Sequence, residues 1–387
     1  MRSQIKELLI LHFLNDGVRT SLVILLPFIA KDLSLSLTQA GFLGASQPLL
    51  GALLALPTGY IIGKLGGVHV LFALLIAYSL GALGIALAPN VSILFIAYFA
   101  AAMGFGMFHT VGFSLTAKNS TPDNVGRNMG NFTAIGEIGR VSLPPLAVFA
   151  VSFLGWRPTL GIVGIVGIIL FFALKLFSPP KDVHIFGAEK PQNHKEFIRD
   201  VIYLFRNRQA AYISLAAVID SLASSPIYVY LPFLLLAKGI NATELSIAMG
   251  GFFVGSLLGK AFLGLSVDKL GNRKVFIISE LFMAAALVLV AQSSNYLLLL
   301  FFAIILGIFT KGTSPVVQTM FSKLTDKEHY HKVFAVSELI IGLAAVLTIT
   351  MMGSLADKTG ITNIFYSAAV LAILATLPVF VLHKNKF

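Results

Sequence analysis

The stretch LLILHFLNDGVRTSLVILLPFIA, residues 8–30, is apolar along most of its length, but four polar side chains interrupt it. His12, Asn15, Asp16 and Arg19 follow the spacing i, i+3, i+4, i+7, which places all four on one stripe of an α-helix. A stretch of about 20 apolar residues crosses a bilayer core. Ionisable groups at that depth are costly and face a bundle interior or a wet cavity. The stripe therefore predicts part of a polar pathway through a membrane.

The composition of the whole chain agrees with a membrane protein. Of its 387 residues, 57% are hydrophobic and 12% are charged, and the mean hydropathy is +0.88. Soluble domains carry about 25% charged residues. We predict twelve membrane spans, at residues 8–30, 40–62, 69–88, 91–117, 130–154, 159–177, 210–236, 245–267, 274–292, 295–322, 332–355 and 362–382. No cleaved signal peptide is expected, because the first span is long and charged at its centre.

The net charge of +11 is distributed as a topology signal. Of the 28 Lys and Arg residues, 20 fall in connections on one side of the predicted spans and 4 on the other. The positive-inside rule then places both termini in the cytoplasm of a multi-pass protein of the cell (inner) membrane. We expect a lipid bilayer and a small-molecule solute as partners, no nucleic acid, and a monomer. The chain has no cysteine, which excludes disulfides, thiolate metal sites and cysteine catalysis.

The spans divide into two halves that resemble each other. We predict bundles at residues 1–177 and 209–387, joined by a polar cytoplasmic linker at 178–208. At an offset of about 205 residues, Pro27 pairs with Pro232, and Asn15 pairs with Asp220. Parallel repeats of this kind occur in one class of secondary transporter. The predicted fold is an all-α polytopic membrane protein of two pseudo-symmetric six-helix bundles.

The sequence GLSVDKLGNRK, residues 264–274, lies between two spans of the second half. It resembles the cytoplasmic G-x-x-x-D-[RK]-x-G-x-[RK]-[RK] loop of the major facilitator superfamily. The corresponding loop of the first half, residues 59–69, has Gly63 in place of the acid. The resemblance implies a gating loop in which an acid caps a helix end, made of Gly264, Asp268, Lys269, Gly271, Arg273 and Lys274.

Within that superfamily, three stretches resemble fosmidomycin-resistance-like efflux proteins driven by protons. They are HFLND at 12–16, GMFH at 106–109 and GEIGRVSLP at 136–144, the last lying over the glycine-rich helix 5 motif of proton-driven antiporters. The resemblance implies export coupled to protons.

Two pairs of opposite charges lie at i, i+3: Asp16 with Arg19, and Glu137 with Arg140. Either each pair is self-neutralising and structural, or the pairs line a cavity where the basic member meets an anionic group. Asp220 and Glu338 have no base within three or four positions of their own helices. We therefore predict proton coupling at Asp220 and Glu338 equally, with Asp16 behind them.

Further polar groups complete the predicted site. Lys311 could hold a solute anion or balance Asp220 or Glu338, and both alternatives are open. His12 and His109 are either packing residues or contacts to a solute or proton. Glu280 is expected to reach the membrane interface. The predicted solute-binding set is His12, Asn15, Arg19, His109, Glu137, Arg140 and Lys311.

Other classes of function have little support. No nucleotide-binding loop or nucleophile–base pair is recognisable, and His12, Asp16 and His109 are too few to indicate a metal site. We predict no enzyme, metal or cofactor, with the proton as coupling ion. The predicted function is proton-coupled export of a small polar or anionic solute by alternating access. The alternatives are proton-linked uptake of a sugar or organic acid, and a non-transporting receptor or lipid-handling scaffold.

Overall fold

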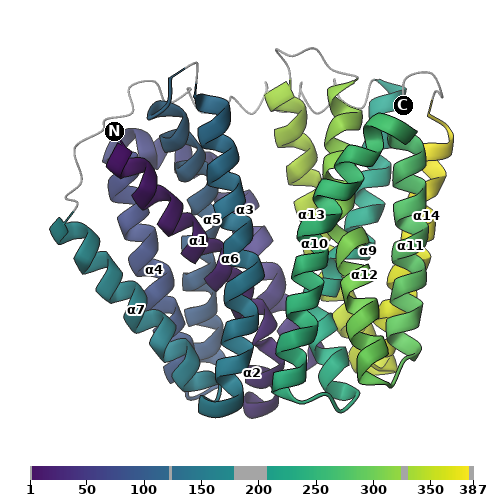
Figure 1. Cartoon of the computed structure of the whole chain (residues 1–387). Helices are drawn as coiled ribbons and strands as arrows, with labels where there is room; N and C mark the ends of the chain where they lie inside the picture. Colours follow the sequence, from purple (N-terminus) through teal and green to yellow (C-terminus); the bar gives the residue numbers. More distant parts are fainter. Residues whose placement is uncertain (1, 122–123, 178–206, 324–329, 383–387) are drawn as a thin grey trace. The chain divides into compact units, whose positions relative to one another are not determined.

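The computed structural model describes residues 2–121, 124–177, 207–323 and 330–382 (Figure 1). These residues form long helices joined by short connections, with no strand among them. The helices are α1 (Arg2–Ile24), α2 (Leu26–Leu33), α3 (Leu37–Leu65), α4 (Gly67–Leu87), α5 (Val91–Lys118), α6 (Val125–Leu154), α7 (Trp156–Phe177), α9 (Arg208–Ala237), α10 (Ala242–Leu270), α11 (Asn272–Gln292), α12 (Tyr296–Ser322), α13 (Tyr330–Thr359) and α14 (Thr362–Phe380).

Most of these helices are suited to a membrane. Among the described residues, 10 are long and apolar enough to cross one, and α1 with α2 makes an eleventh span bent by 42°. Pro27 accounts for the break after α1, because proline cannot donate a backbone hydrogen bond and its ring displaces the preceding turn. Each of the twelve predicted spans falls on one helix or on the bent pair. The predicted all-α polytopic fold is therefore confirmed.

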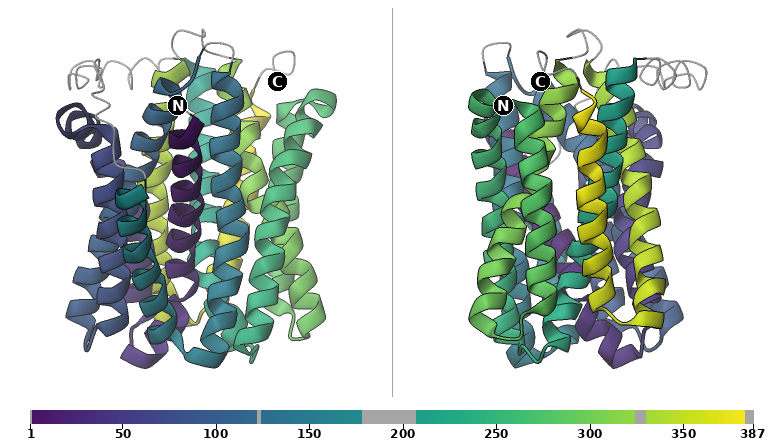
Figure 2. Two further views of the ribbon diagram at one scale, coloured as in Figure 1. Left: turned by 60° about the vertical axis from the view of Figure 1, so that its left-hand side comes forward. Right: turned by 90° about the vertical axis from the view of Figure 1, so that its right-hand side faces the viewer.

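The chain forms two compact units. Unit 1 contains α1, α2, α3 from Ser46 onward, and α4 to α7; unit 2 contains residues 36–45 at the start of α3 together with α9 to α14. Within each unit the helices run side by side (Figure 2). Most of the predicted linker, residues 178–206, lies outside the described residues.

In unit 1, α1 and α6 pack backbone against backbone. A Cβ atom on Gly139 of α6 would overlap the carbonyl oxygen of Phe13, and one on Gly17 of α1 would lie 2.8 Å from the carbonyl oxygen of Gly139. Small residues permit such close crossings in membranes. This contact brings the polar stripe of α1 against the charged turn of α6.

In unit 2, a close crossing of the same kind joins a different pair of helices, α10 and α12. Cβ atoms on Gly255 and Gly259 would overlap the carbonyl oxygens of Ile304 and Ile308. Beside this pair, α9 packs on α13 and α14, and α11 packs on α12 and α14. Buried side chains of α11 and α12, including Phe276 and Phe321, form the core there. Polar groups on α9 and α11 are consequently held in an apolar interior.

Candidate functional site

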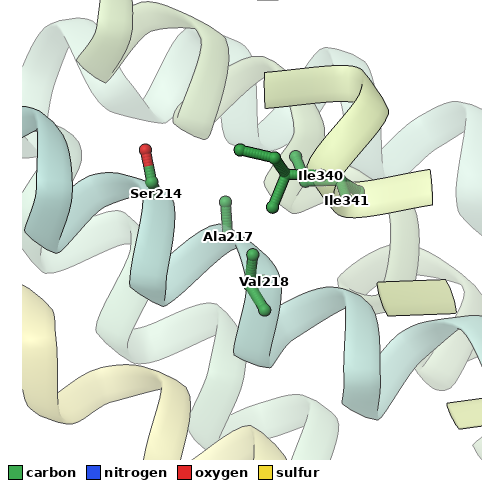
Figure 3. Close-up of a pocket in the computed structure, with 5 residues that line it drawn as sticks. All are labelled: Ser214, Ala217, Val218, Ile340 and Ile341. Atoms are coloured by element: carbon green, nitrogen blue, oxygen red, sulfur yellow. The ribbon is translucent and has the colours of Figure 1, made fainter. Parts of the chain in front are cut away.

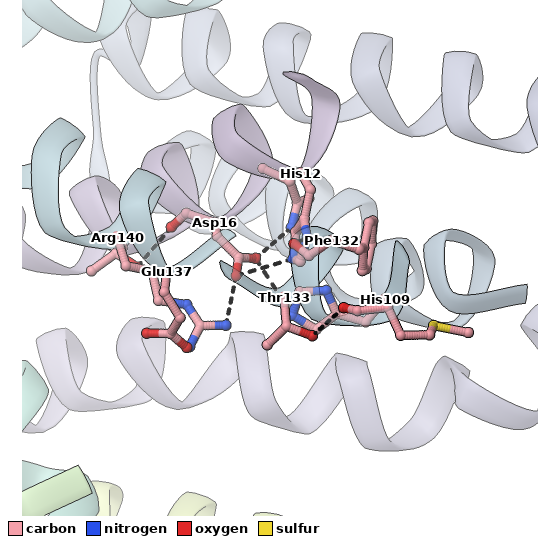
Figure 4. A network of polar contacts seen from close by, with 10 residues as sticks. His12, Asp16, His109, Phe132, Thr133, Glu137 and Arg140 are labelled. Carbon is pink, nitrogen blue, oxygen red and sulfur yellow. Dashed lines mark hydrogen bonds and ion pairs between the residues drawn. The ribbon is translucent and has the colours of Figure 1, made fainter. Parts of the chain in front are cut away.

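Asp16 of α1 is the centre of a polar cluster in unit 1 (Figure 4). Its side chain is 1% exposed. Arg140 of α6 donates from Nη2 to Oδ2 over 2.6 Å, and Asn15 donates to Oδ1 over 3.0 Å. His12 Nε2 lies 3.3 Å from Oδ2, and His109 Nε2 of α5 lies 3.4 Å from Oδ1. Three helices therefore supply the surroundings of this carboxylate.

Arg140 bridges two acids. Its Nη1 donates to Glu137 Oε1 over 2.9 Å, which confirms the predicted i, i+3 pair within α6. The Arg140 side chain is 35% exposed, whereas Asp16 is almost fully enclosed. Charge-assisted hydrogen bonds of this kind are short and strong. The guanidinium is thus the most exposed group in contact with Asp16, followed by His109 at 31%.

The predicted pairing of Asp16 with Arg19 is wrong. Arg19 Nε donates instead to Oε1 of Gln47 on α3 over 3.2 Å, and Gln47 Nε2 donates back to the Arg19 carbonyl over 3.1 Å. The reason is the close crossing of α1 and α6, which presents Arg140 directly to Asp16. Gln47 was not predicted, although a glutamine inside an apolar span is a recognisable signal.

His12 is packed as well as polar. Its ring stacks on Phe132 with centroids 3.9 Å apart, and Nδ1 lies 2.7 Å from the Phe132 carbonyl oxygen. A carbonyl only accepts, so Nδ1 carries a proton. Nε2 faces the Asp16 carboxylate, and a protonated His12 therefore donates from both nitrogens. The packing interpretation of His12 is therefore supported, and its contact with a proton or solute stays a prediction.

The same cluster has the composition of a metal site. Among the described residues, ligand atoms of His12, Asp16 and His109 all lie within 4.8 Å of one another. Arg140, however, already places a positive charge on the Asp16 carboxylate. A divalent cation there would be repelled by the guanidinium. We therefore assign no metal to the cluster.

Asp220 of α9 is the centre of a second cluster, in unit 2. Its Oδ2 accepts a hydrogen bond from Thr313 of α12 over 3.0 Å. Lys311, two residues earlier on α12, acts electrostatically on Asp220, and its Nζ lies 4.8 Å from the ring centre of Tyr228. Of the two interpretations of Lys311, balancing of Asp220 agrees with this electrostatic interaction, and solute binding stays a prediction.

The expectation that Glu280 reaches the membrane interface is wrong. The residue is 0% exposed, and its carboxyl group lies within hydrogen-bonding reach of Asp220. The signal was present in the sequence: Phe276, Glu280, Met283 and Leu287 share the spacing i, i+4, i+7, i+11 of one helix face, and all four are buried. Glu338 lies on α13, but its side chain is outside the described residues.

The predicted gating loop is mostly helical: residues 264–270 are the end of α10, Gly271 joins the two helices, and Arg273 and Lys274 lie in the first turn of α11. Gly271 adopts φ +82°, a conformation that favours glycine. Arg273 donates to the carbonyl oxygens of Phe380 over 2.8 Å and Leu382 over 3.3 Å, so it caps the end of α14. The remaining predicted loop residues are exposed or partly exposed: Gly264, Asp268, Lys269 and Lys274. Within the described part of the chain, the cap is thus supplied by the base and not by Asp268.

A small recess lies between α9 and α13 (Figure 3). It holds about 160 Å³ of space not filled by atoms and is lined by Ser214, Ala217, Val218, Ile340 and Ile341. One hydroxyl among apolar side chains offers little to recognise a polar solute. We assign no solute site to it.

Comparison with known proteins identifies the family. Residues 8–219 and 213–386 match the Major Facilitator Superfamily. The chain belongs to the Major Facilitator Superfamily. The multi-drug resistance efflux pump PmrA of Streptococcus pneumoniae is 22% identical over 370 residues, covering 93% of this chain and 90% of that protein. The probable nitrate transporter NarT of Staphylococcus epidermidis is 24% identical over 371 residues, covering 94% and 91%.

Solved structures of the Major Facilitator Superfamily show the same fold. A bacterial homolog of the human lysosomal transporter Spinster, in an inward-facing and occupied conformation, has a TM-score of 0.82 at 16% identity and covers 98% of this chain and 96% of its own. The nucleoside transporter NupG has a TM-score of 0.80 at 16% identity, covering 97% and 98%. The protein is thus a membrane transporter and not an enzyme. Its resemblance to fosmidomycin-resistance-like proteins stays a prediction.

Proposed function

We propose that this transporter moves a small anionic solute by alternating access, and that proton binding is coupled to solute binding at the cluster of Asp16 and Arg140. One observation carries the proposal. A partly exposed guanidinium is held by two acids, Asp16 at 2.6 Å and Glu137 at 2.9 Å.

The coupling follows from charge. An anion that binds Arg140 competes with Asp16 and Glu137 for the guanidinium. An acid that loses its partner in a buried place is costly as an anion, and a proton removes that cost. By linkage, proton binding then favours anion binding to the same degree. The solute and the proton would therefore bind together and move in the same direction, which is inward under an inward proton gradient.

The class of solute follows from the guanidinium. Its planar fork of donors matches a flat or tetrahedral oxyanion such as a carboxylate, nitrate or phosphate. His109, 31% exposed beside Asp16, supplies a second nitrogen at the same place. The relative named as a probable nitrate transporter supports nitrate as the first solute to test.

Export is the second candidate. The relative named as a multi-drug resistance efflux pump matches 93% of this chain. In export against protons, a solute with a cationic or donor group would compete with the proton for Asp16 and Glu137. Solute and proton would then exclude each other and move in opposite directions.

Proteoliposomes with an imposed pH gradient separate these candidates. With the outside acidic, nitrate or another small anion should accumulate, and Arg140→Gln should reduce its transport at least about tenfold, as expected for loss of a charge-assisted hydrogen bond of about 1.4 kcal/mol or more. Arg127→Gln is the control, because Arg127 is an exposed arginine on the same helix. Solute movement opposite to the protons would favour export. Absence of transport across a broad panel would favour a receptor.

The proposal also includes the topology and the state of assembly. The excess of Lys and Arg in one set of connections supports cytoplasmic termini in a bacterial-type inner membrane. We further propose that the protein works as a monomer in the bilayer. Single cysteines introduced near each terminus test the topology, because labelling from one side of the membrane then reports where that terminus lies. The native chain has no cysteine that would interfere.

A further inference from the structure

Unit 2 holds two acids in contact deep inside the protein. Asp220 of α9 is 9% exposed and Glu280 of α11 is 0% exposed. Their carboxyl groups lie within hydrogen-bonding reach of one another, although the residues are separated by 60 positions in the chain. Carboxyl groups are rarely buried completely unless a partner satisfies them.

The hydrogen bonds of this pair are incomplete if both acids are ionised. Asp220 Oδ2 accepts from the Thr313 hydroxyl. Among the described residues, no donor reaches Asp220 Oδ1 or either oxygen of Glu280. An ionised carboxylate only accepts, whereas a protonated one also donates. A single proton on one of the acids would supply a donor for the hydrogen bond between them.

The charged residues around the pair also favour one bound proton. On α12, Lys311 acts on Asp220 and carries one positive charge. On α14, which packs against α9 and α11, there is no Asp, Glu, Lys, Arg or His from Thr362 to Phe380. The Glu338 side chain on α13 is outside the described residues. With one proton, the pair carries one negative charge, which matches the charge of Lys311; with none, it carries two negative charges in a buried place.

We propose that Asp220 and Glu280 form a binding site for one exchangeable proton, carried by Glu280 and donated to Asp220. Thr313 determines the side on which the proton resides. Its hydroxyl donates to Asp220 Oδ2, which stabilises the ionised form of Asp220. Glu280 then donates to Oδ1, so that both oxygens of Asp220 accept a hydrogen bond. The site requires neither a particular solute nor a direction of transport, so it can be tested apart from the proposed function.

Infrared difference spectroscopy of the purified, full-length protein tests the proton directly. A protonated carboxyl group has its own C=O stretching band, which shifts when H2O is replaced by D2O. The wild type should show this band at neutral pH and lose it as the pH is raised. Glu280→Gln should abolish the band while its amide still donates to Asp220. Glu244→Gln should keep it, because Glu244 is a partly exposed acid in the capping box of α10 and glutamine preserves that box.

Asp220→Asn provides a second test that does not depend on the folding of Glu280→Gln. Glu280 alone in an apolar interior should stay protonated, so the band should persist at pH values where the wild type has lost it. The proposal fails if the band is unchanged in both variants, since the proton then resides elsewhere. It also fails if replacing choline with Na⁺ at constant ionic strength removes the band at neutral pH, because the pair would then be an alkali-metal site.

Discussion

Each unit buries an acid in its interior, but the two units give that acid opposite kinds of partner. In unit 1 the buried acid Asp16 is paired with a base, Arg140, from another helix. In unit 2 the buried acid Asp220 is paired with another acid, Glu280. An acid–base pair is neutral without a proton, and its base can release the acid to bind an anionic solute. An acid–acid pair needs a proton and offers little to an anion. The difference suggests that unit 1 recognises the solute and unit 2 holds a proton.

The strongest test of this difference is removal of the base. Arg140→Met leaves Asp16 and Glu137 without their shared partner, and we expect the free energy of unfolding to fall by about 3 kcal/mol, the lower end for breaking a buried ion pair. Unfolding in detergent micelles, monitored by circular dichroism, measures the change. Adding Asp16→Asn should restore part of the loss. If the double variant were no more stable than Arg140→Met, the acid and the base would not be coupled.

The second test removes the close contact that creates the pair in unit 1. Gly139→Ala should cost about 2 kcal/mol of stability, because the new methyl group overlaps the Phe13 carbonyl oxygen and forces α1 away from α6. Solute transport should fall with it. Gly130→Ala is the matched control, since it lies on the same helix with no atom within 4 Å of its Cβ position, and it should be neutral or slightly stabilising. Equal effects of both variants would show that the crossing does not depend on Gly139.

The third test concerns pH and unit 2. If the folded protein holds a proton on Glu280 that the unfolded chain has lost near neutral pH, the folded state binds more protons, so stability must fall as the pH rises. One such proton gives a slope of about 1.4 kcal/mol per pH unit at most. Glu280→Gln should flatten this dependence. The measurement is the midpoint of unfolding of the wild type and of Glu280→Gln at several pH values. If stability depends on pH equally in both proteins, the acid–acid interpretation is contradicted.

The same comparison shows what the sequence can reveal. Hydropathy located the spans, and helical spacing located the Glu137–Arg140 pair, because both are local properties. The partner of Asp16 lies 124 residues away, and Arg19 on the same stripe was the nearer choice along the chain. Only the glycine-mediated crossing of α1 and α6 decides between them. Glu280 shares one helix face with apolar residues, which the sequence shows. Whether that face is buried depends on how α11 packs, which the sequence does not show.

The smallest expected change in stability concerns the C-terminal ends of two corresponding helices, α4 in unit 1 and α11 in unit 2. In unit 1, Arg157 donates to the carbonyl oxygens of Ala86 and Ala88 at the end of α4. In unit 2, Lys238 donates to those of Ala291 and Ser293 at the end of α11, and burial lowers its pKa. Lys238→Met should cost about 1 kcal/mol of stability, since a base at a helix C-terminus satisfies unpaired carbonyls.

Lys31→Met is the control for that last substitution, because Lys31 is an exposed lysine near the end of α2. It should change the midpoint of thermal unfolding by less than Lys238→Met does. Burial lowers the pKa of Lys238 below its unfolded value, so the unfolded chain holds this proton more tightly than the folded protein. Wild-type stability should then rise with pH between the two pKa values, and the cost of Lys238→Met should grow as the pH is raised. An effect that is equal at all pH values would mean that the aliphatic stem, and not the charge, holds the end of α11.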